Sequence, residues 1–347
     1  MMGGCSIEHD AVINLRSAVA SVLRRGARVA LFGAMVALAA TAAPMPASAQ
    51  SMMTLCERDV PTAELDFCNT IGQAIEITQA RVGIAAIGGN PTLGTSSTLG
   101  MRIGSFPRIA VTPRVNVGKV RLPATATRNG NEVDAWVPVV AVDGAVGIYQ
   151  GLSLMPTVGG FGSIDGLFTL GRVLLPGDDG FDSGITTWGI GAQVGILRES
   201  FTVPGISVTG MYRSLGDVVH GDPDVTDTEG HFALDGLSAW SARATIGKRF
   251  LLFSATAGLG YDWYSSDALL RYVTDDPSTD GTRTVRQGDF SSKRLTAFGN
   301  LAFTVVIVSL VGEVGWQQGA DSFSGPGATD LLEKDGWYGS LGLRLTF

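Results

Sequence analysis

Outside its N-terminal region, this chain of 347 residues lacks an apolar run long enough for a transmembrane helix, which needs about 20 residues. Its mean hydropathy is nevertheless positive, at +0.24. Strands that alternate apolar and polar residues give a high apolar content without long apolar runs, because successive side chains point to opposite faces of the sheet. The composition therefore favours a sheet protein over a helical membrane protein.

The chain also lacks the short motifs that mark common catalytic and nucleotide-binding sites. It contains no GxSxG, no CxxC zinc pair, no P-loop and no HExxH. The formal net charge is −7, which argues against a nucleic-acid partner. We expect no cofactor.

Cysteine is scarce, and only three are present. Cys5 belongs to the N-terminal region, which leaves Cys56 and Cys68. Two cysteines twelve positions apart in an exported chain predict one disulfide.

Residues 1–49 have the features of a secretory signal peptide. Arg24, Arg25 and Arg28 form part of a basic region, and an apolar run extends from there to Ala43. The small residues around Ala49 predict cleavage there, so that the mature chain begins at Gln50. A membrane anchor is the alternative, but the run is short for a membrane span, and Pro44 follows it directly.

The last strand-like segment, 336–347, carries the strongest fold signal. Trp337, Leu341 and Leu345 share one parity, whereas Ser340 and Arg344 share the other. A period of two indicates a strand with one apolar and one polar face. The segment ends on Phe347 and resembles the closing strand of bacterial outer-membrane β-barrels, in which a terminal Phe is part of the assembly signal.

The same alternation recurs in nine earlier segments, which are 109–117, 140–148, 163–170, 188–196, 206–213, 240–248, 251–264, 294–303 and 308–317. We predict an all-β fold: a closed antiparallel transmembrane barrel of about 10 strands, within a range of about 8 to 14. Residues 97–105 are a candidate for a further strand, and Pro113 fits an edge or irregular strand. A soluble β-sandwich or soluble barrel is the alternative.

The connections between these segments differ in length, with long ones at about 118–132, 175–184, 214–235, 264–291 and 318–335. Barrels of this class have short periplasmic turns and long external loops, which sets the orientation. All six tryptophans then fall at one height near the outer interface and predict an aromatic girdle. They are Trp136, Trp188, Trp240, Trp263, Trp316 and Trp337.

Residues 50–96 are predicted to lie outside the barrel wall, which takes up 97–347. Apolar periodicity favours a helix from Pro61 to about Ala86, and Gly88 with its neighbours ends it. This helix and its Gly-rich continuation could plug the lumen, lie under the barrel on the periplasmic side or contact a partner. A helix and a Gly-rich plug ahead of a barrel are loosely similar to the long-chain fatty-acid transporter family.

Charged residues collect on the parity that we assign to the lumen. They are Arg102, Arg108, Arg114, Asp143, Asp165, Arg213, Arg243, Asp262, Arg294, Glu313 and Arg344. One interpretation is a mildly cationic channel that favours anionic solutes. The other is a set of ion pairs that tie strands across a lumen with little open bore.

The predicted loop 214–235 is acidic and holds weak candidates for a metal site, namely Asp222, Asp224, Asp227 and Glu229. A solvated loop is the simpler interpretation. His220 and His231 lie in the same loop and could serve a barrel enzyme, although no fixed frame for catalysis is evident. We expect no enzymatic activity.

The sequence predicts passive passage of small solutes, anionic or hydrophobic, across the outer membrane of a Gram-negative bacterium. The alternative is a structural or surface-interaction barrel with a blocked lumen. The expected partners are outer-membrane lipids and lipopolysaccharide, the outer-membrane assembly machinery and a small-molecule solute.

Overall fold

A computed structural model describes residues 52–100, 107–123, 132–153, 159–182, 184–201, 203–222, 224, 230–274 and 281–347. The predicted signal peptide, its cleavage site and the sequence predictions for Arg102, Asp227 and Glu229 lie outside these ranges. So does most of the candidate strand 97–105, and residues 97–100 are not in a strand.

Within the described ranges, ten strands close into an antiparallel barrel in which each strand pairs with its sequence neighbours and β1 pairs with β10. The strands are β1 (Ile109–Leu122), β2 (Val133–Tyr149), β3 (Ser163–Val173), β4 (Ile185–Leu197), β5 (Gly205–His220), β6 (Gly230–Phe250), β7 (Phe253–Val273), β8 (Thr282–Val305), β9 (Val308–Gln317) and β10 (Gly336–Thr346). The predicted fold class is confirmed, and each of the ten predicted segments overlaps one strand.

The two ends of the barrel differ. At one end β6 and β7 are joined through Leu251 and Leu252, and β8 and β9 through Val306 and Ile307. Phe347 also lies at this end, which we call the short-turn end. The opposite, long-loop end carries the connection 318–335 and a 3-10 turn, η3 (Gly177–Asp179).

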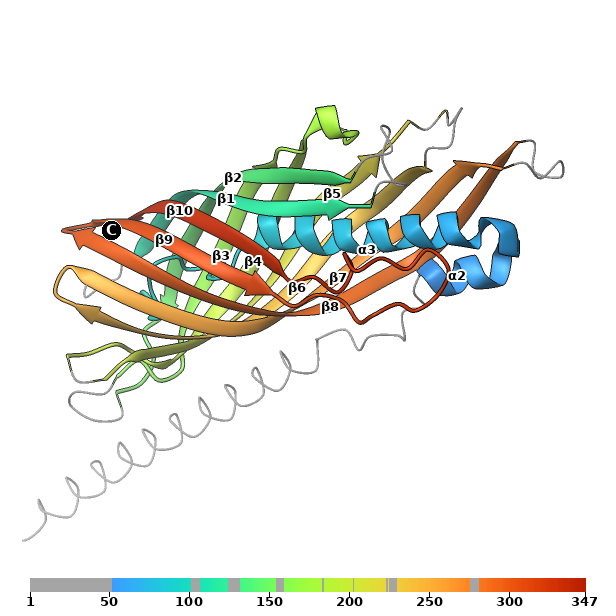
Figure 1. The fold of residues 1–347 in the computed structure, drawn as a ribbon. Helices are drawn as coiled ribbons and strands as arrows, with labels where there is room; N and C mark the ends of the chain where they lie inside the picture. The colour runs from blue at the N-terminus through green and yellow to red at the C-terminus, as the bar shows by residue number, and fades with distance from the viewer. Residues whose placement is uncertain are drawn as a thin grey trace, which may run out of the picture. The chain divides into compact units, whose positions relative to one another are not determined.

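Four strands extend far beyond their predicted ends. Most of the predicted loops 214–235 and 264–291 is strand, because β5 to β8 continue past the other strands at the long-loop end (Figure 1). In this extension the inward faces are apolar, as at Phe232, Leu234 and Leu270, which are fully buried. In the rest of the wall, apolar residues face outward and polar residues face inward. Because this pattern is reversed in the extension, the sequence analysis assigned these residues to loops.

Pro113 lies in a strand that has neighbours on both sides, so of the two predicted alternatives, an edge strand or an irregular strand, the irregular strand is the one observed. The pairing of β1 with β10 is interrupted at Thr112 and Pro113 and resumes at Arg114. Proline has no N–H to donate to a neighbouring strand, so it is tolerated where the ladder is locally broken.

Three helices precede the barrel strands in the described part of the chain: α2 (Met52–Asp59), the short η1 (Thr62–Glu64) and α3 (Leu65–Ile87). The predicted helix is present as η1 and α3, whereas α2 was not predicted. Gly88 follows α3 with φ 66°, as the predicted stop requires. The predicted disulfide joins Cys56 of α2 to Cys68 of α3. None of the described helices is long and apolar enough to cross a bilayer.

Candidate functional site: the occupied lumen

The lumen is occupied by α3 and by residues 88–100, which together we call the lumen segment (residues 65–100). Nineteen residues of α3 are buried, and Figure 1 shows the helix running inside the ring of strands from the long-loop end. The contacts of residues 88–100 continue toward the short-turn end, as described below. The plug is therefore the arrangement observed among the three that the sequence left open.

At the long-loop end, Glu64 of η1, directly before the lumen segment, makes polar contacts to β7, to Thr274 that follows it, and to β8. The Glu64 carboxylate accepts hydrogen bonds from Tyr272 Oη at 2.9 Å and Thr274 Oγ1 at 2.5 Å, and it pairs with Arg283 Nε at 2.9 Å. Burial favours the neutral acid. The two hydroxyl hydrogen bonds and the Arg283 charge outweigh that effect and lower the pKa of Glu64.

The connection 318–335 also contacts α3. Gln73 Nε2 donates to the Gly327 carbonyl at 2.8 Å, and its Oε1 accepts from the Thr329 N–H at 3.0 Å. Asn69 Nδ2 donates to the Pro326 carbonyl at 3.1 Å. These side-chain amides bind backbone groups of the connection and so attach it to the helix.

The C-terminal end of α3 is capped by polar side chains of β1. Arg114 Nη2 donates to the Ile87 carbonyl and Asn116 Nδ2 to the Ala85 carbonyl, each at 3.1 Å. The last carbonyls of a helix lack partners within the helix and carry partial negative charge, so a cation here is favourable. Arg114 also pairs with Asp143 of β2 at 2.8 Å, which balances its buried charge.

The turn after α3 lies between a cation and an anion of the wall. The Glu313 carboxylate accepts the backbone N–H groups of Gly89 and Asn90, each at 3.1 Å. From another part of the wall, Arg243 Nε donates to the Gly89 carbonyl at 3.1 Å. Arg243 is itself paired with Asp262 at 2.7 Å, and both side chains are fully buried.

The remainder of the lumen segment extends toward the short-turn end in an irregular conformation. Arg344 Nη1 donates to the Leu93 carbonyl at 3.3 Å. The Asp165 carboxylate accepts the N–H groups of Leu99, at 2.6 Å, and of Gly100, at 3.4 Å. The wall therefore supplies the hydrogen bonds that this stretch cannot make internally.

Nine of the predicted lumen charges are buried inside the barrel, with exposures of 7% or less. They are Arg114, Asp143, Asp165, Arg213, Arg243, Asp262, Arg294, Glu313 and Arg344. Arg108 is exposed, and it donates to the Leu99 carbonyl at 3.4 Å. The ion pairs Arg114–Asp143 and Arg243–Asp262 tie neighbouring strands. Arg294 instead pairs with Glu76 of α3, at 2.6 Å.

Sequence reasoning missed several residues that hold the lumen segment, including Asn116, Glu76, Gln73 and Gln79. Gln79 Nε2 donates to Ser266 Oγ at 3.0 Å, and its Oε1 accepts from Ser292 Oγ. Asn116 has the same parity in β1 as Arg114, but the sequence does not show its partner in α3. The signal that could have identified them is the recurrence of polar residues along a helix whose other residues are mostly apolar.

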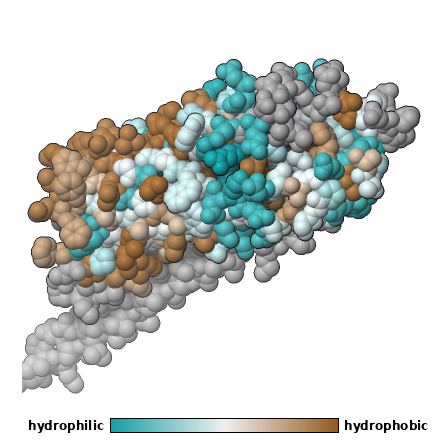
Figure 2. All heavy atoms as spheres, in the orientation of Figure 1, coloured by the Kyte–Doolittle hydropathy of each residue, from teal (hydrophilic) through white to brown (hydrophobic). Residues whose placement is uncertain are grey.

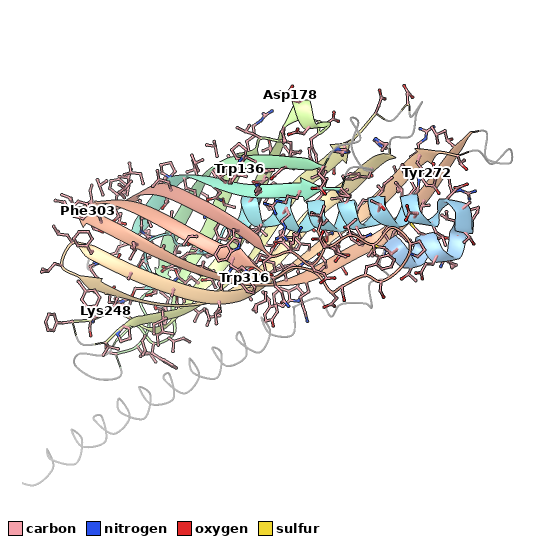
Figure 3. The ribbon with its side chains drawn as sticks, viewed as in Figure 1. Trp136, Asp178, Lys248, Tyr272, Phe303 and Trp316 are labelled. Carbon is pink, nitrogen blue, oxygen red and sulfur yellow. A yellow bond between two sulfur atoms is a disulfide. The ribbon has the colours of Figure 1, made fainter. Side chains whose placement is uncertain are left out.

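The outer surface divides at the tryptophans. Trp136, Trp188, Trp240 and Trp337 are exposed, while Trp263 and Trp316 are partly buried. Strand pairing aligns Trp337 with Trp316 and Trp240 with Trp263. Figure 3 shows Trp136 and Trp316 midway along the barrel, with Phe303 and Lys248 toward the short-turn end.

Between the tryptophans and the short-turn end, the exposed side chains are largely apolar, and we call this band the apolar belt. It includes Leu170, Ile190, Leu259, Leu301, Leu310 and Leu343. In Figure 2 brown residues gather on the short-turn half of the visible face, and paler and teal residues on the other half. The ten residue-to-residue steps from Trp337 to Phe347, at a strand tilt of about 40°, rise about 25 Å, which matches the apolar band of a transmembrane barrel.

The two histidines and the described acidic candidates, Asp222 and Asp224, contact aromatic rings and backbone groups. His220 is buried, stacks on Phe232 and meets Phe181 edge-on, with centroids 4.8 Å apart in both cases. His231 Nδ1 lies 3.3 Å from the Gly221 carbonyl. The Asp222 carboxylate accepts the Asp224 N–H at 2.9 Å. Within the described residues, no three His, Cys, Asp or Glu side chains are grouped so that they could hold a metal ion.

A scan against protein-family models and a search of curated proteins both find no match. Solved structures that are similar to this chain are bacterial outer-membrane barrels. The outer membrane protease OmpT from Escherichia coli has 13% identity and a TM-score of 0.33, covering 71% of this chain and 98% of its own. The translocator domain of the autotransporter NalP from Neisseria meningitidis has 12% identity and a TM-score of 0.33, covering 80% and 98%.

The toluene transporter TodX from Pseudomonas putida has 9% identity and a TM-score of 0.33, covering 76% of this chain and 98% of its own. The class defined by the closed barrel and its apolar belt is the bacterial outer-membrane β-barrel. The activities named for these three proteins differ from one another, and the likeness concerns architecture alone.

Proposed function

We propose that this chain is an outer-membrane barrel closed by its own N-terminal segment, and that it acts through the surface at its long-loop end. The observation that carries the proposal is the continuous attachment of residues 65–100 to the wall. A solute of appreciable size would have to displace this segment, and displacement breaks the contacts to Arg114, Arg243 and Glu313. The long-loop end faces the cell exterior, because long loops are external in this class.

Conductance in planar bilayers tests this proposal. The wild-type mature protein should show only brief, small openings, because the lumen segment is bonded along its length. Glu313→Gln should increase the frequency of openings several-fold, since an amide offers one acceptor where the carboxylate served the N–H groups of Gly89 and Asn90. Glu333→Gln, at an exposed position of the 318–335 connection, is the matched control and should leave the trace unchanged.

A large, steady conductance of the wild-type protein would contradict the closed barrel. It would favour the second candidate function, passive passage of small anionic solutes. One observation supports that candidate: a cavity of about 550 Å³ at the short-turn end is lined by Arg108, Arg198, Arg249 and Arg344 with a single carboxylate, Glu199. Deleting residues 50–96 tests the segment itself and should give a large conductance under the closed-barrel proposal.

A further inference from the structure

At the long-loop end, the seam between β1 and β10 is one of the places where strand pairing stops before the longer strand ends. Their pairing ends at Gly118 and Tyr338. Beyond that point β1 continues to Leu122 and pairs with β2, whereas β10 begins only at Gly336. The residues Lys119–Leu122 therefore border the 318–335 connection instead of a neighbouring strand.

A cavity of about 460 Å³ lies at this seam, and we call it the seam pocket. Its volume is in the range of sites for small organic molecules. Its walls include outward-facing residues of the belt and buried residues of the lumen segment. They are Val117, Trp136, Val314 and Trp337 on the outside, and Ile77 and Arg81 of α3 on the inside.

The mouth of the seam pocket is apolar and lies at the height of the tryptophans. Trp136 and Trp337 are 61% and 63% exposed, and both belong to the boundary of the apolar belt. An aromatic ring at that height lies at the interface between hydrocarbon and headgroups. The pocket is thus placed where one molecule can contact both.

The inner end of the pocket holds a buried guanidinium with an unused donor. Arg81 is 7% exposed, and its Nη2 donates to the Lys334 carbonyl. Its Nη1 is buried and has no hydrogen-bond partner among the described residues. A side chain at Gly336 would collide with Nη1, so this nitrogen lies against the pocket wall.

The charges around the pocket have a small positive excess. Lys119, Arg121 and Lys334 also line it, together with Asp335. Asp134 pairs with Lys119 at 2.8 Å and lies 3.6 Å from Arg121, and Asp330 pairs with Lys334 at 2.8 Å. Four cations face three carboxylates, which leaves one positive charge for a bound anion.

We propose that the seam pocket binds the phosphate headgroup of a lipid from the outer leaflet, with the acyl chain lying over Trp136 and Trp337. A buried guanidinium with a free N–H is suited to phosphate, which accepts charge-assisted hydrogen bonds. The position of the mouth selects an amphiphile of the membrane over a solute of the aqueous phase. This inference is independent of whether the lumen conducts.

Tryptophan quenching by brominated lipids tests the proposal. The full-length mature protein is placed in phosphatidylcholine vesicles, and phosphatidic acid with a brominated chain is titrated in. Quenching should reach half its maximum at a mole fraction about tenfold lower than with a brominated phosphatidylcholine of the same chain. Trp136→Phe should reduce the quenched amplitude, because that ring lines the mouth.

Three variants identify the residues responsible. Arg81→Met should abolish the preference for phosphatidic acid. Lys119→Met changes an accessible residue at the mouth and should weaken the preference several-fold, which keeps the test decisive if Arg81→Met does not fold. Lys293→Met is the matched control. Both lysines lie over an aromatic ring, Lys119 at 5.4 Å from the centroid of Trp136 and Lys293 at 5.7 Å from that of Tyr261, but Lys293 is away from the pocket.

Equal quenching by the two lipids would overturn the proposal, as would an unchanged preference in both Arg81→Met and Lys119→Met. A brominated fatty acid that binds as well as phosphatidic acid would overturn the choice of phosphate. Inorganic phosphate that competes at concentrations equal to those of the lipid would overturn the choice of a lipid.

Discussion

Individual charged residues of the lumen bind mainly backbone groups of the lumen segment. Arg114, Arg243 and Arg344 donate to its carbonyls, while Asp165 and Glu313 accept its N–H groups. Backbone recognition of this kind suits the Gly- and Thr-rich stretch 88–100, whose small side chains offer few contacts of their own. Truncating one side chain of a buried ion pair in the lumen would leave the other charge unpaired, which costs about 3–5 kcal/mol of folding free energy.

Glu64 provides a pH test at this scale. Its pKa is lowered in the folded protein by Thr274, Tyr272 and Arg283, against the opposing effect of burial. The carboxylate therefore stabilises the fold above its unfolded pKa of about 4.3, and this stabilisation is lost as pH falls through the lower folded value. We expect amide exchange in α2 and the start of α3 to accelerate below about pH 4.

The variant Glu64→Gln should show fast exchange at neutral pH and little further change on acidification. Glu57→Gln, an exposed residue of α2, is the control and should behave as the wild type. Exchange at the start of α3 that does not respond to pH in the wild type would show that Glu64 does not anchor this end.

Among the elements, α3 approaches the barrel wall most closely where it has glycine in place of a larger residue. A Cβ atom at Gly83 would lie 2.2 Å from Cε1 of Tyr264, so the helix approaches β7 too closely for a larger residue. Alanine is a better helix former than glycine by up to about 1 kcal/mol. If α3 were free of the wall, Gly83→Ala would stabilise the protein.

In the closed barrel, Gly83→Ala should instead destabilise it by about 1–3 kcal/mol, as overpacking of a core does. Thermal unfolding in detergent measures the effect. The double variant Gly83→Ala with Tyr264→Leu should recover part of the loss, because the shorter side chain vacates the position of the ring. Stabilisation by the single variant would contradict the packing described for α3.

Sequence alternation located all ten strands but not the extensions of β5 to β8. The strands were recognised by their apolar outward-facing residues, and this pattern is present only within the apolar belt. In the extensions, α3 covers the inside and the outer side carries exposed polar residues such as Asp267 and Arg286, so the apolar Leu215, Phe232 and Leu270 are fully buried instead. A reversal of polarity along one strand is therefore informative, because it marks where the surroundings of the wall change.

For the molecule as a whole, the proposed orientation puts η1 and η3 outside the cell and the short turns in the periplasm. A membrane-impermeant maleimide on intact cells tests this placement. Thr62→Cys and Asp178→Cys, both exposed at the long-loop end, should be labelled. Val306→Cys, 90% exposed at the short-turn end, should be labelled only after the cells are permeabilised. The reverse pattern would invert the orientation.

The charged members of the candidate site could be predicted from inward parity, but their purpose could not. Glu313 and Gly89 are 224 positions apart, and Arg243 and Gly89 are 154 apart. Alternation within one strand carries no information about a partner so distant. The helix and its Gly88 stop were predictable because both signals are local, whereas its place in the lumen depends on contacts with many strands.

The most direct test of the central claim, that residues 65–100 lie inside the lumen, is an engineered disulfide between α3 and the wall. A Cβ atom at Gly118 would lie 2.8 Å from the Cβ of Ala85, and a separation increase of about 1 Å gives disulfide geometry. The pair Ala85→Cys and Gly118→Cys should cross-link in the folded membrane-embedded protein, as peptide mass spectrometry would detect. Ala85→Cys with Gly210→Cys, an outward-facing site, should not. A folded protein in which only the second pair cross-links, or neither does, would contradict the account.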